Sequence, residues 1–458
     1  MRILLISPNI EFLPDPIFPL GIANIAAVLS KAGISHRILD LCFVEDYEKA
    51  ITAEVDRYQP DLVGLSLRNL DNVSYPNYTS YLPFYRQVVA IIRKSTTCSI
   101  AVGGSAFSLM PEEILDYLQA DFGVAGEGER GFMALIQEIQ AAPMDSAQKK
   151  RRIFFDRDIG VVYNLDELPI AERMGLDVKA YHRYGGMGNI QTKRGCPFHC
   201  IYCTYPLIEG KKVRLRSPAK ICEEIEDILR QGIDNLFVVD NEFNFPMEHA
   251  QFVCHEILRK KLKVNWSGYA NPKFMTGRLA ALMKDSGCTG VEFGSDAADP
   301  TMLSTMGKDF TVADMRKASD ICKNSELAFC HSLLLGGPGE TMQSVQRTFD
   351  TIEEMTPTAV ICMIGIRIFP RTKLYAIARD EGKIHPGQNL LDPVFYLSSH
   401  IENEIIPFIE NFAATHPTWI FPGMNINISR PLQQKIRRLG AKGPLWEYMR
   451  LGLRQKKN

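Results

Sequence analysis

The stretch Arg194-Gly195-Cys196-Pro197-Phe198-His199-Cys200-Ile201-Tyr202-Cys203 decides what the rest of this chain must provide. It spaces three cysteines as C-x3-C-x2-C and places Tyr202 directly before the last one. Three thiolates on one loop can hold three irons of a 4Fe–4S cluster. The fourth iron then has no protein ligand and is open to a small molecule. The sequence therefore predicts a cluster bound by Cys196, Cys200 and Cys203.

A zinc site and a disulfide are the other uses of clustered cysteines. Structural zinc takes four nitrogen or sulfur ligands, and no second cysteine or histidine pair follows at zinc spacing. His199 lies inside the motif, where it would face away from ligands bound by its neighbours. The total of 11 cysteines is odd, and the first residues form a short strand pattern rather than a secretory signal. We therefore expect the remaining cysteines to be buried thiols in a reducing cytoplasm.

Length and composition exclude several classes of protein. A chain of 458 residues suggests two or three domains, and 46% hydrophobic with 23% charged residues is ordinary for a globular protein. The formal net charge of −1 provides no basic field for nucleic acid. No apolar run reaches the ~20 residues that a membrane-spanning helix needs. We expect a cytoplasmic protein without a nucleic-acid partner or a membrane span.

Residues 1–140 alternate short apolar strands with amphipathic helices, which predicts a parallel, doubly wound α/β sheet. The expected strands are Ile3–Ile6, Ser35–Leu39, Leu62–Ser66, Ile100–Gly103 and Phe122–Val124. Ligands of such sheets bind outside the carboxyl ends of the strands. The candidate ligand-binding residues at those ends are Pro8, Asn9, Ser66, Leu67, Arg68, Asn69, Gly103, Gly104, Ser105, Gly126, Glu127 and Gly128.

Residues 187–375 repeat the strand-then-helix pattern and predict a partial (β/α)6 barrel. The expected strands are 188–192, 235–239, 264–268, 290–293, 328–335 and 359–363. Barrel active sites lie at the carboxyl ends of the strands, and the cysteine loop follows the first strand.

Two further segments flank the predicted barrel. Residues 141–186 read as a charged linker with a basic run at Lys149–Arg152 and a strand-like Val161–Tyr163. Residues 376–458 read as a mainly helical cap with a turn at Trp419–Gly423 and a frayed basic tail at Arg454–Asn458.

Four elements in chain order resemble the signature of radical S-adenosylmethionine (radical SAM) enzymes: the cysteine loop, Asp240-Asn241-Glu242, Gly294-Ser295-Asp296 and the stretch from Gly336 to Thr341. The resemblance implies that the open iron takes the amino and carboxylate groups of SAM. Asp240 and Glu242 are expected to project the same way from an extended segment and to accept the ammonium, and which of them does so stays open.

The same resemblance assigns roles to other residues. Ser295 and Asp296 are expected to bind the SAM carboxylate and the ribose hydroxyls. The nucleoside pocket is expected to be shaped by Gly336, Gly337, Glu340 and Arg371. We expect Tyr202 to act beside the cluster as a catalytic residue.

The first domain resembles the cobalamin-binding domain found before many radical SAM barrels. The matching pieces are Pro19-Leu20-Gly21-Ile22-Ala23, Val102-Gly103-Gly104-Ser105 and Gly126-Glu127-Gly128-Glu129. The Asp-x-His-x-x-Gly motif, whose histidine ligates cobalt, is absent from the sequence, so the resemblance implies binding without a protein histidine. Arg68 is expected to lie under the corrin and to keep cobalt free of a strong lower ligand. The alternatives are a solvent-facing arginine, a pair with Asp71, and a domain that holds no cobalamin.

Taken together, the chain resembles the cobalamin-dependent radical SAM family over residues 1–375, and the loop Arg68–Asn72 resembles that of tryptophan C-methyltransferases. The resemblance implies transfer of a methyl group from SAM, through cobalamin, to an unactivated carbon or phosphorus of a small-molecule or amino-acid-derived substrate. An electron donor such as flavodoxin or ferredoxin is the expected protein partner.

Two other functions stay open. One is a radical SAM oxidoreductase, cyclase or rearrangement enzyme, and the other is a non-catalytic cobalamin or redox sensor. His331, Tyr269, Asn271 and Arg367 stand near strand ends and are candidates for substrate contact, with buried structural roles as the alternative. The sequence does not select a proton acceptor.

Overall fold

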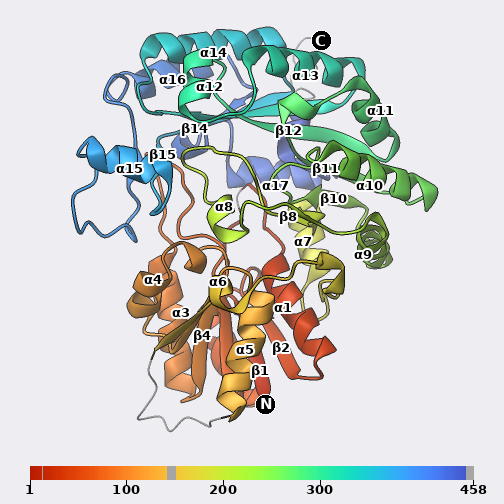
Figure 1. The fold of residues 1–458 in the computed structure, drawn as a ribbon, viewed down its shortest axis with the longest axis vertical. Coiled ribbons are helices and arrows are strands. Elements are labelled where there is room, and N and C mark those ends of the chain that lie inside the picture. Colours follow the sequence, from red (N-terminus) through yellow and green to blue (C-terminus); the bar gives the residue numbers. More distant parts are fainter. Residues whose placement is uncertain (13, 142–150, 450–458) are drawn as a thin grey trace.

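The computed structural model describes residues 1–12, 14–141 and 151–449. It consists of two parallel sheets, one above the other, each with helices on its faces (Figure 1). Lys149 and Lys150 of the predicted basic run, and the predicted tail Arg454–Asn458, lie outside the described residues.

The first sheet has six parallel strands in the order β2-β1-β3-β4-β5-β6. Their bounds are β1 Arg2–Ser7, β2 Ser35–Asp40, β3 Leu62–Ser66, β4 Ser99–Gly103, β5 Phe122–Ala125 and β6 Arg152–Phe155. Helices α1 (Leu20–Lys31) and α5 (Gly128–Ala141) cover one face. Helices α2 (Tyr47–Tyr58), α3 (Leu82–Ser95) and α4 (Pro111–Leu118) cover the other. Ile3 to Ile6 are all buried because both faces of a doubly wound sheet are covered.

The first sheet extends into the segment that was predicted to be a linker. β6 pairs in parallel with β5 and buries Phe154, and the short helix α6 (Asp156–Ile159) follows it. The strand expected at Val161–Tyr163 is wrong: these residues form no strand, and the Tyr163 side chain is exposed.

The second sheet has seven parallel strands in the order β17-β14-β13-β12-β11-β10-β7. Their bounds are β7 Gly188–Ile190, β10 Asn235–Val238, β11 Asn265–Ala270, β12 Cys288–Asp296, β13 Ala328–Leu335, β14 Ala359–Ile364 and β17 Trp419–Ile420. The connecting helices are α9 Pro218–Arg230, α10 Met247–Arg259, α11 Gly277–Asp285, α12 Pro300–Thr305, α13 Val312–Asn324 and α14 Met342–Met355. The six predicted strands are all present.

The seventh strand corrects the turn that was expected at Trp419–Gly423. Trp419 and Ile420 form β17, which pairs in parallel with β14, and only Pro422–Met424 is a 3-10 turn. The Trp419 ring stacks on Phe349 at a centroid distance of 4.4 Å, and its Nε1 donates to Glu353 at 2.6 Å. Helix α14 therefore holds this strand at the edge of the sheet.

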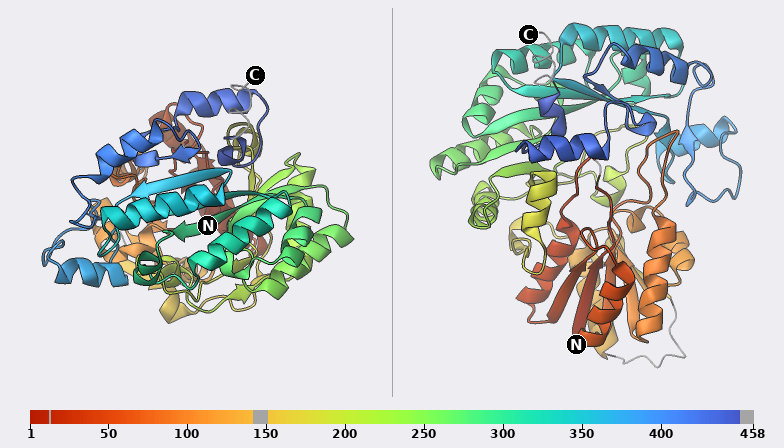
Figure 2. Two further views of the ribbon diagram at one scale, coloured as in Figure 1. Left: turned by 90° about the horizontal axis from the view of Figure 1, so that it is seen from above. Right: turned by 180° about the vertical axis from the view of Figure 1, so that it is seen from behind.

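The C-terminal part contains helices α15 (Lys373–Asp380), α16 (Ile405–Ala413) and α17 (Arg430–Arg438), together with β17 and the small ribbon of β15 (Ile366–Arg367) and β16 (Phe395–Tyr396). We call the boundary between the first sheet and the second sheet, with their helices, the seam. Figure 2, right, shows α17 lying across it. On α17, Gln433 donates to the carbonyl of Phe12 at 2.9 Å, which ties this segment to the first domain.

None of the helices in the described ranges combines the length and the apolar character that crossing a bilayer requires.

Candidate active site

The cysteine loop lies at the seam, between the two-residue strand β8 (Lys193–Arg194) and the short helix α8 (Tyr205–Ile208) (Figure 1). Gly195 has a φ of +93°, and a Cβ there would lie 2.2 Å from the Lys212 carbonyl oxygen, so only glycine fits. The loop is held from the barrel side, because Ile201 donates its amide to the Met306 carbonyl at 3.1 Å. The fold thus presents three cysteines on one fixed loop.

The three thiols are close enough to influence each other. Burial raises the pKa of Cys196 to about 11 and the pKa of Cys203 to about 12, and the neighbouring thiols add to both shifts. Nowhere in the described part of the chain do three His, Cys, Asp or Glu side chains gather tightly enough for a single metal ion. A cubane cluster asks for a wider arrangement, because each cysteine binds a different iron.

Glu242 is the predicted SAM ligand that faces this loop. Its charge raises the pKa of both Cys196 and Cys200, and burial raises its own pKa to about 8. Its Oε2 atom is buried and has no hydrogen-bond partner within the described residues. An orphaned carboxylate oxygen beside the cysteines fits the ammonium of a bound SAM.

Asp296 also faces the loop, at the end of β12. Its Oδ2 accepts from the Tyr202 hydroxyl at 2.5 Å and from Lys308 Nζ at 2.8 Å. Burial raises the pKa of Tyr202, and Asp296 raises it further. Burial raises the pKa of Cys200, and the charge of Lys308 offsets part of that rise. Tyr202 and Lys308 thus connect the acidic end of β12 to the cysteines.

Asp240 does not project with Glu242, because the chain turns after Val238 instead of continuing as a strand. Asp240 accepts from the backbone amide of Thr192 at 2.7 Å and lies 3.6 Å from Lys193 Nζ. It therefore braces the start of the cysteine loop, and of the two carboxylates only Glu242 is available to a ligand.

Ser295 and His331 are also turned away from the site. The Ser295 hydroxyl hydrogen-bonds His331 Nδ1 at 2.7 Å, and His331 Nε2 lies 3.2 Å from the Ser319 hydroxyl on α13. Both side chains are fully buried in the barrel wall. His331 thus has the buried structural role that the sequence analysis named as its alternative, and the contact of Ser295 with SAM stays a prediction.

Glu340 braces its own loop rather than a nucleoside. It accepts from the backbone amides of Gly336 and Gly337, the latter at 3.1 Å, and is buried. A Cβ on Gly337 would lie 2.8 Å from the Met306 sulfur, so this glycine allows close packing against the segment that holds the cysteine loop.

The carboxyl edge of the first sheet forms a narrow apolar slot of about 50 Å³ between α1 and α5. Predicted residues in its lining are Ser66, Gly103, Gly104 and Gly128. Gly104 has a φ of +99°, and a Cβ there would lie 2.5 Å from the Leu67 carbonyl oxygen. At the same edge, the Nδ2 atom of Asn9 is buried without a partner in the described residues. The slot is far smaller than the ~300–1,000 Å³ of a small-molecule site, so a large ligand at this edge would lie outside the strand ends and not inside the slot.

Other residues of this edge support the loop that carries Arg68. Ser105 donates its hydroxyl to the Arg68 carbonyl at 2.7 Å, and the Leu67 amide donates to the Gly103 carbonyl at 2.8 Å. Pro8 is buried, and Asn69 is partly buried with its carbonyl accepting from Tyr85 at 2.9 Å.

Glu127 forms an ion pair instead of facing a ligand. It pairs with Arg214 and Arg194, while Glu129 accepts from Arg194 at 2.6 Å. Burial alone would raise the pKa of Glu129, but Arg194 and Arg214 hold it below its usual range. Arg194 directly precedes the cysteine loop, so these pairs fasten that loop to the turn that begins at Gly126.

Arg68 is exposed in the described structure and points to the seam. Burial raises the pKa of Tyr205, which follows the cysteines, and the charge of Arg68 offsets part of that rise. Glu292 raises the pKa of Tyr269 on β11, and Arg68 again acts in the opposite direction. Asp71, the partner that the sequence suggested, pairs with Arg367 at 2.9 Å instead. Arg68 thus lies between the cysteine loop and the barrel, with its Nη1 3.1 Å from the side-chain amide of Asn69.

Three other candidates have structural partners. Arg367 is buried against Asp71, and Arg371 donates to the carbonyls of Ser108 at 2.9 Å and Leu109 in the first domain. Asn271 caps the 3-10 turn that follows β11, accepting from the Lys273 amide at 3.0 Å. Arg367 and Asn271 thus have the structural roles that the sequence analysis named as alternatives, and the role of Arg371 at the adenine stays a prediction.

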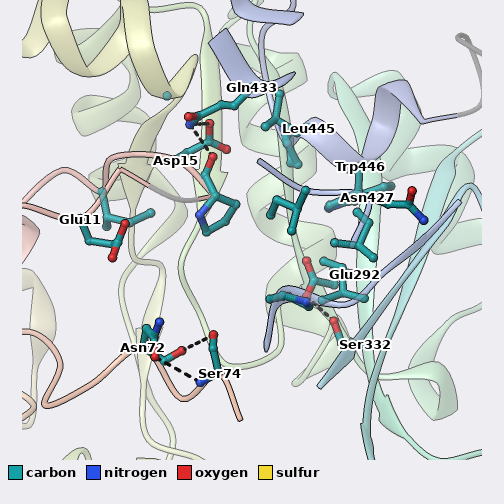
Figure 3. Close-up of a pocket in the computed structure, with 18 of the residues that line it drawn as sticks. Glu11, Asp15, Asn72, Ser74, Glu292, Ser332, Asn427, Gln433, Leu445 and Trp446 are labelled. Atoms are coloured by element: carbon teal, nitrogen blue, oxygen red, sulfur yellow. Dashed lines mark hydrogen bonds between the residues drawn. The ribbon is translucent and has the colours of Figure 1, made fainter. Parts of the chain in front are cut away.

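A cavity of about 540 Å³ opens inside the barrel (Figure 3). Strands β10 to β14 form one wall, and the segment from Pro422 to Met449 closes the other, with first-domain loops at its mouth. We call this cavity the barrel chamber. Tyr269 lines it and also lies near Arg68 and Tyr205, so the chamber borders the seam.

Sequence reasoning missed several residues of this region: Arg194, Arg214, Glu129, Lys308, Glu292 and Ser332. One signal was present. Glu292 interrupts the apolar strand Gly290-Val291-Glu292-Phe293, and a charged residue at an inward position of a barrel strand indicates a site. The arginine–glutamate pairs gave no such signal, because their partners are far apart in sequence.

Two family models match consecutive parts of the chain. The B12 binding domain matches residues 10–136, and the Radical SAM superfamily matches residues 190–352.

Among curated proteins, a tryptophan 2-C-methyltransferase of Streptomyces laurentii is 26% identical over 439 residues, covering 80% of this chain and 72% of the relative. An uncharacterised methyltransferase of Pyrococcus horikoshii is 26% identical over 398 residues, covering 83% and 84%.

Among solved structures, the radical S-adenosylmethionine methyltransferase TsrM of Kitasatospora setae, with tryptophan substrate and a SAM analogue bound, superposes with a TM-score of 0.86. It is 24% identical, and the alignment covers 100% of each chain. This likeness shows that the two sheets and their order are shared. With a B12-binding domain directly ahead of a radical SAM domain, the chain belongs to the cobalamin-dependent radical SAM family.

Proposed function

We propose that this protein is a cobalamin-dependent radical SAM methyltransferase that acts on a small molecule held in the barrel chamber. The observation that carries the proposal is the meeting of three features at the seam: the cysteine loop, the glycine edge of the first sheet, and Arg68 between them. The two curated relatives described above are both named methyltransferases, which supports methyl transfer over oxidation or rearrangement.

The chain's own residues divide the work of binding. Cys196, Cys200 and Cys203 would hold the cluster, and Glu242 would accept the ammonium of SAM. The carboxyl edge of the first sheet, where Gly104 keeps the backbone bare of a side chain, would hold cobalamin outside the strand ends. When bound, these groups supply reducing electrons and a transferable methyl group.

Arg68 and Asp296 have different tasks in this arrangement. Arg68 would place a positive charge at the face of the corrin, where it disfavours electron-poor cobalt. Asp296, held by Tyr202 and Lys308, would fix the end of β12 next to SAM. The C-terminal segment covers the chamber and keeps water from the reacting groups.

The substrate and the electron donor are also proposals. TsrM is named with tryptophan as its substrate, and we propose a small or amino-acid-derived molecule here. A flavodoxin or ferredoxin as reductant stays a prediction.

The deciding experiment is anaerobic reconstitution with iron, sulfide and hydroxocobalamin, followed by desalting and a UV–visible spectrum. We expect cobalamin bands beside the broad iron–sulfur absorption. Cys200→Ala should lose the iron–sulfur absorption, whereas Cys254→Ala, a buried single cysteine on α10, should keep it. Iron–sulfur absorption without retained cobalamin would contradict the proposal.

The mass of the product then separates methyl transfer from its rivals. A methylated product adds one methyl group, whereas oxidation or rearrangement adds none. A reduced protein that does not consume SAM would support a sensor instead.

A further inference from the structure

The barrel chamber is lined mostly by apolar side chains, with aromatic rings on opposite sides. Phe237 and Tyr269 come from the strands, and Trp446 comes from the C-terminal segment. Ile361, Met363 and Leu445 complete the apolar lining. A volume of about 540 Å³ lies within the ~300–1,000 Å³ range of small-molecule sites. The lining suits a flat, apolar molecule.

Most polar groups at the mouth of the chamber are already engaged by other groups (Figure 3). Asp15 pairs with Arg437 at 2.7 Å and lies 3.3 Å from Gln433 Nε2. Asn72 accepts from the Thr79 amide at 2.9 Å. Asn427 donates to the Trp419 carbonyl at 2.7 Å. These side chains hold loops together and have little capacity left for a ligand.

Glu292 differs from them, because it is a carboxylate with no ion pair among the described residues. Its Oε1 accepts from the Ser332 hydroxyl at 2.5 Å, as Figure 3 shows. The indole of Trp446 lies beside the same carboxylate and lowers its pKa, as the Ser332 hydroxyl does. Both of these partners are neutral, and no cation of the described residues acts on the Glu292 carboxylate.

The position of Glu292 is costly unless a ligand uses it. Its neighbours on β12, Val291 and Phe293, are fully buried on the opposite face of the strand, so alternation turns Glu292 inward. A carboxylate without a cationic partner is unfavourable in an apolar wall. Burial accordingly raises the pKa of Glu292. A cation or a strong N–H donor in the chamber would remove that cost.

Tyr269 places Glu292 next to the seam. The charge of Glu292 is the main cause that raises the pKa of Tyr269, while Tyr205 and Arg68 act on the same hydroxyl. A molecule bound at Glu292 therefore extends toward the cysteine loop and the cobalamin edge.

We propose that Glu292, oriented by Ser332, is the substrate anchor of the barrel chamber and accepts a hydrogen bond from an ammonium group on a substrate with a flat, apolar body. The inference rests on the proposed function, since it takes the chamber as the place of the methyl acceptor. It also predicts that molecules with an anionic group in that position are rejected, because a second carboxylate would face Glu292 at close range.

The test measures binding rather than turnover, with two probes that share one ring system. Tryptamine carries an ammonium, and 3-indolepropionate carries a carboxylate at the same place. Isothermal titration calorimetry on the reconstituted holoenzyme should show tryptamine binding at least tenfold more tightly than 3-indolepropionate. Glu292→Gln, which keeps the shape of the side chain, should weaken tryptamine binding at least tenfold and remove the discrimination.

Two further variants control the result. Ser332→Ala should weaken tryptamine binding about threefold, because the carboxylate stays but loses its orienting partner. Glu402→Gln changes an exposed glutamate before α16 and should bind as the wild type does. Equal tryptamine affinity in wild type and Glu292→Gln would overturn the proposal, as would no tryptamine binding to the wild type at all.

Cofactor loading is read in the same samples, so that the two proposals fail separately. Tryptamine binding that depends on Glu292 in a protein without cobalamin bands would contradict the methyltransferase and leave the anchor standing. Normal cofactor spectra together with equal tryptamine affinity in wild type and Glu292→Gln would contradict the anchor and leave the methyltransferase standing.

Discussion

Asp71 and Arg367 show at the scale of single residues how this molecule joins its two domains. The two side chains are 1% and 3% exposed and lie 2.9 Å apart, although 296 positions separate them. The guanidinium also donates to the carbonyls of Ile368 and Leu390, both at 2.8 Å. Every charge in this pair is thus compensated inside the protein.

Removing one partner of that pair should be expensive. Arg367→Met leaves the Asp71 carboxylate buried and unpaired, which we expect to lower the free energy of unfolding by about 3–5 kcal/mol in denaturant titrations. Adding Asp71→Asn to Arg367→Met should recover part of the loss. Glu223→Gln breaks an exposed pair with Lys220 and should cost less than about 1 kcal/mol. If Arg367→Met also costs less than about 1 kcal/mol, the buried pair contributes little to stability.

Gly104 allows a second test at the residue scale. An alanine there would meet the Leu67 carbonyl oxygen and push on the loop that carries Arg68, so Gly104→Ala should lose most cobalamin during desalting. Gly33→Ala is the matched control, since Gly33 also has a positive φ (+68°) but its Cβ would meet nothing within 4 Å. Each variant should lose about 1–2 kcal/mol of stability from backbone strain. Equal cobalamin retention by the two would separate Gly104 from the cobalamin site.

At the scale of elements, the loop between β13 and α14 depends on a carboxyl group that prefers to be neutral. Burial raises the pKa of Glu340 to about 7, against an ordinary value of 4.5. The folded protein therefore binds this proton more tightly than the unfolded chain does. Its contribution to stability is full below pH 4.5 and is lost as the pH rises to about 7, a loss on the order of 3 kcal/mol.

Glu340→Gln should remove that part of the pH dependence. The amide oxygen can still accept from the Gly336 and Gly337 amides, but the side chain no longer titrates. Urea titrations at pH 5 and pH 8 should show that the wild type loses about 3 kcal/mol more than the variant between the two values. Parallel pH profiles would mean that Glu340 titrates normally in the folded protein.

The elements that the sequence predicted are those with continuous local patterns. Ile3–Ile6 and Ala328–Leu335 are apolar runs of strand length, and both form strands. The sequence did not predict β6 and β17, because these short segments become strands only by pairing with the edge of a sheet that has already formed. Asp240 and Ser295 were placed by motif position, yet their partners Thr192 and His331 come from other segments of the chain. Spacing along a chain indicates which loop carries a residue, not which way its side chain turns.

At the scale of the whole molecule, the two sheets share one apolar core. Its largest cluster of buried residues includes Leu67 and Leu70 of the first domain with Leu335 and Ile364 of the barrel. Ion pairs at Arg194 and Arg367 cross the same seam. The domain bounds drawn from the sequence therefore describe recurring patterns better than independent folding units.

We expect the protein to unfold as one unit. Differential scanning calorimetry should give a single endotherm, with calorimetric and van't Hoff enthalpies that agree. Two separate endotherms would show that the seam is too weak to couple the sheets.

The place of β17 and Trp446 in the chain has a consequence for biosynthesis. Both belong to the wall that encloses the barrel chamber, yet they lie beyond residue 418, whereas the residues from Met1 to Ile364 already supply every other strand of the two large sheets. A ribosome therefore releases the cysteine loop and the glycine edge well before it releases the last wall. During that interval the barrel chamber of the nascent chain has an open side.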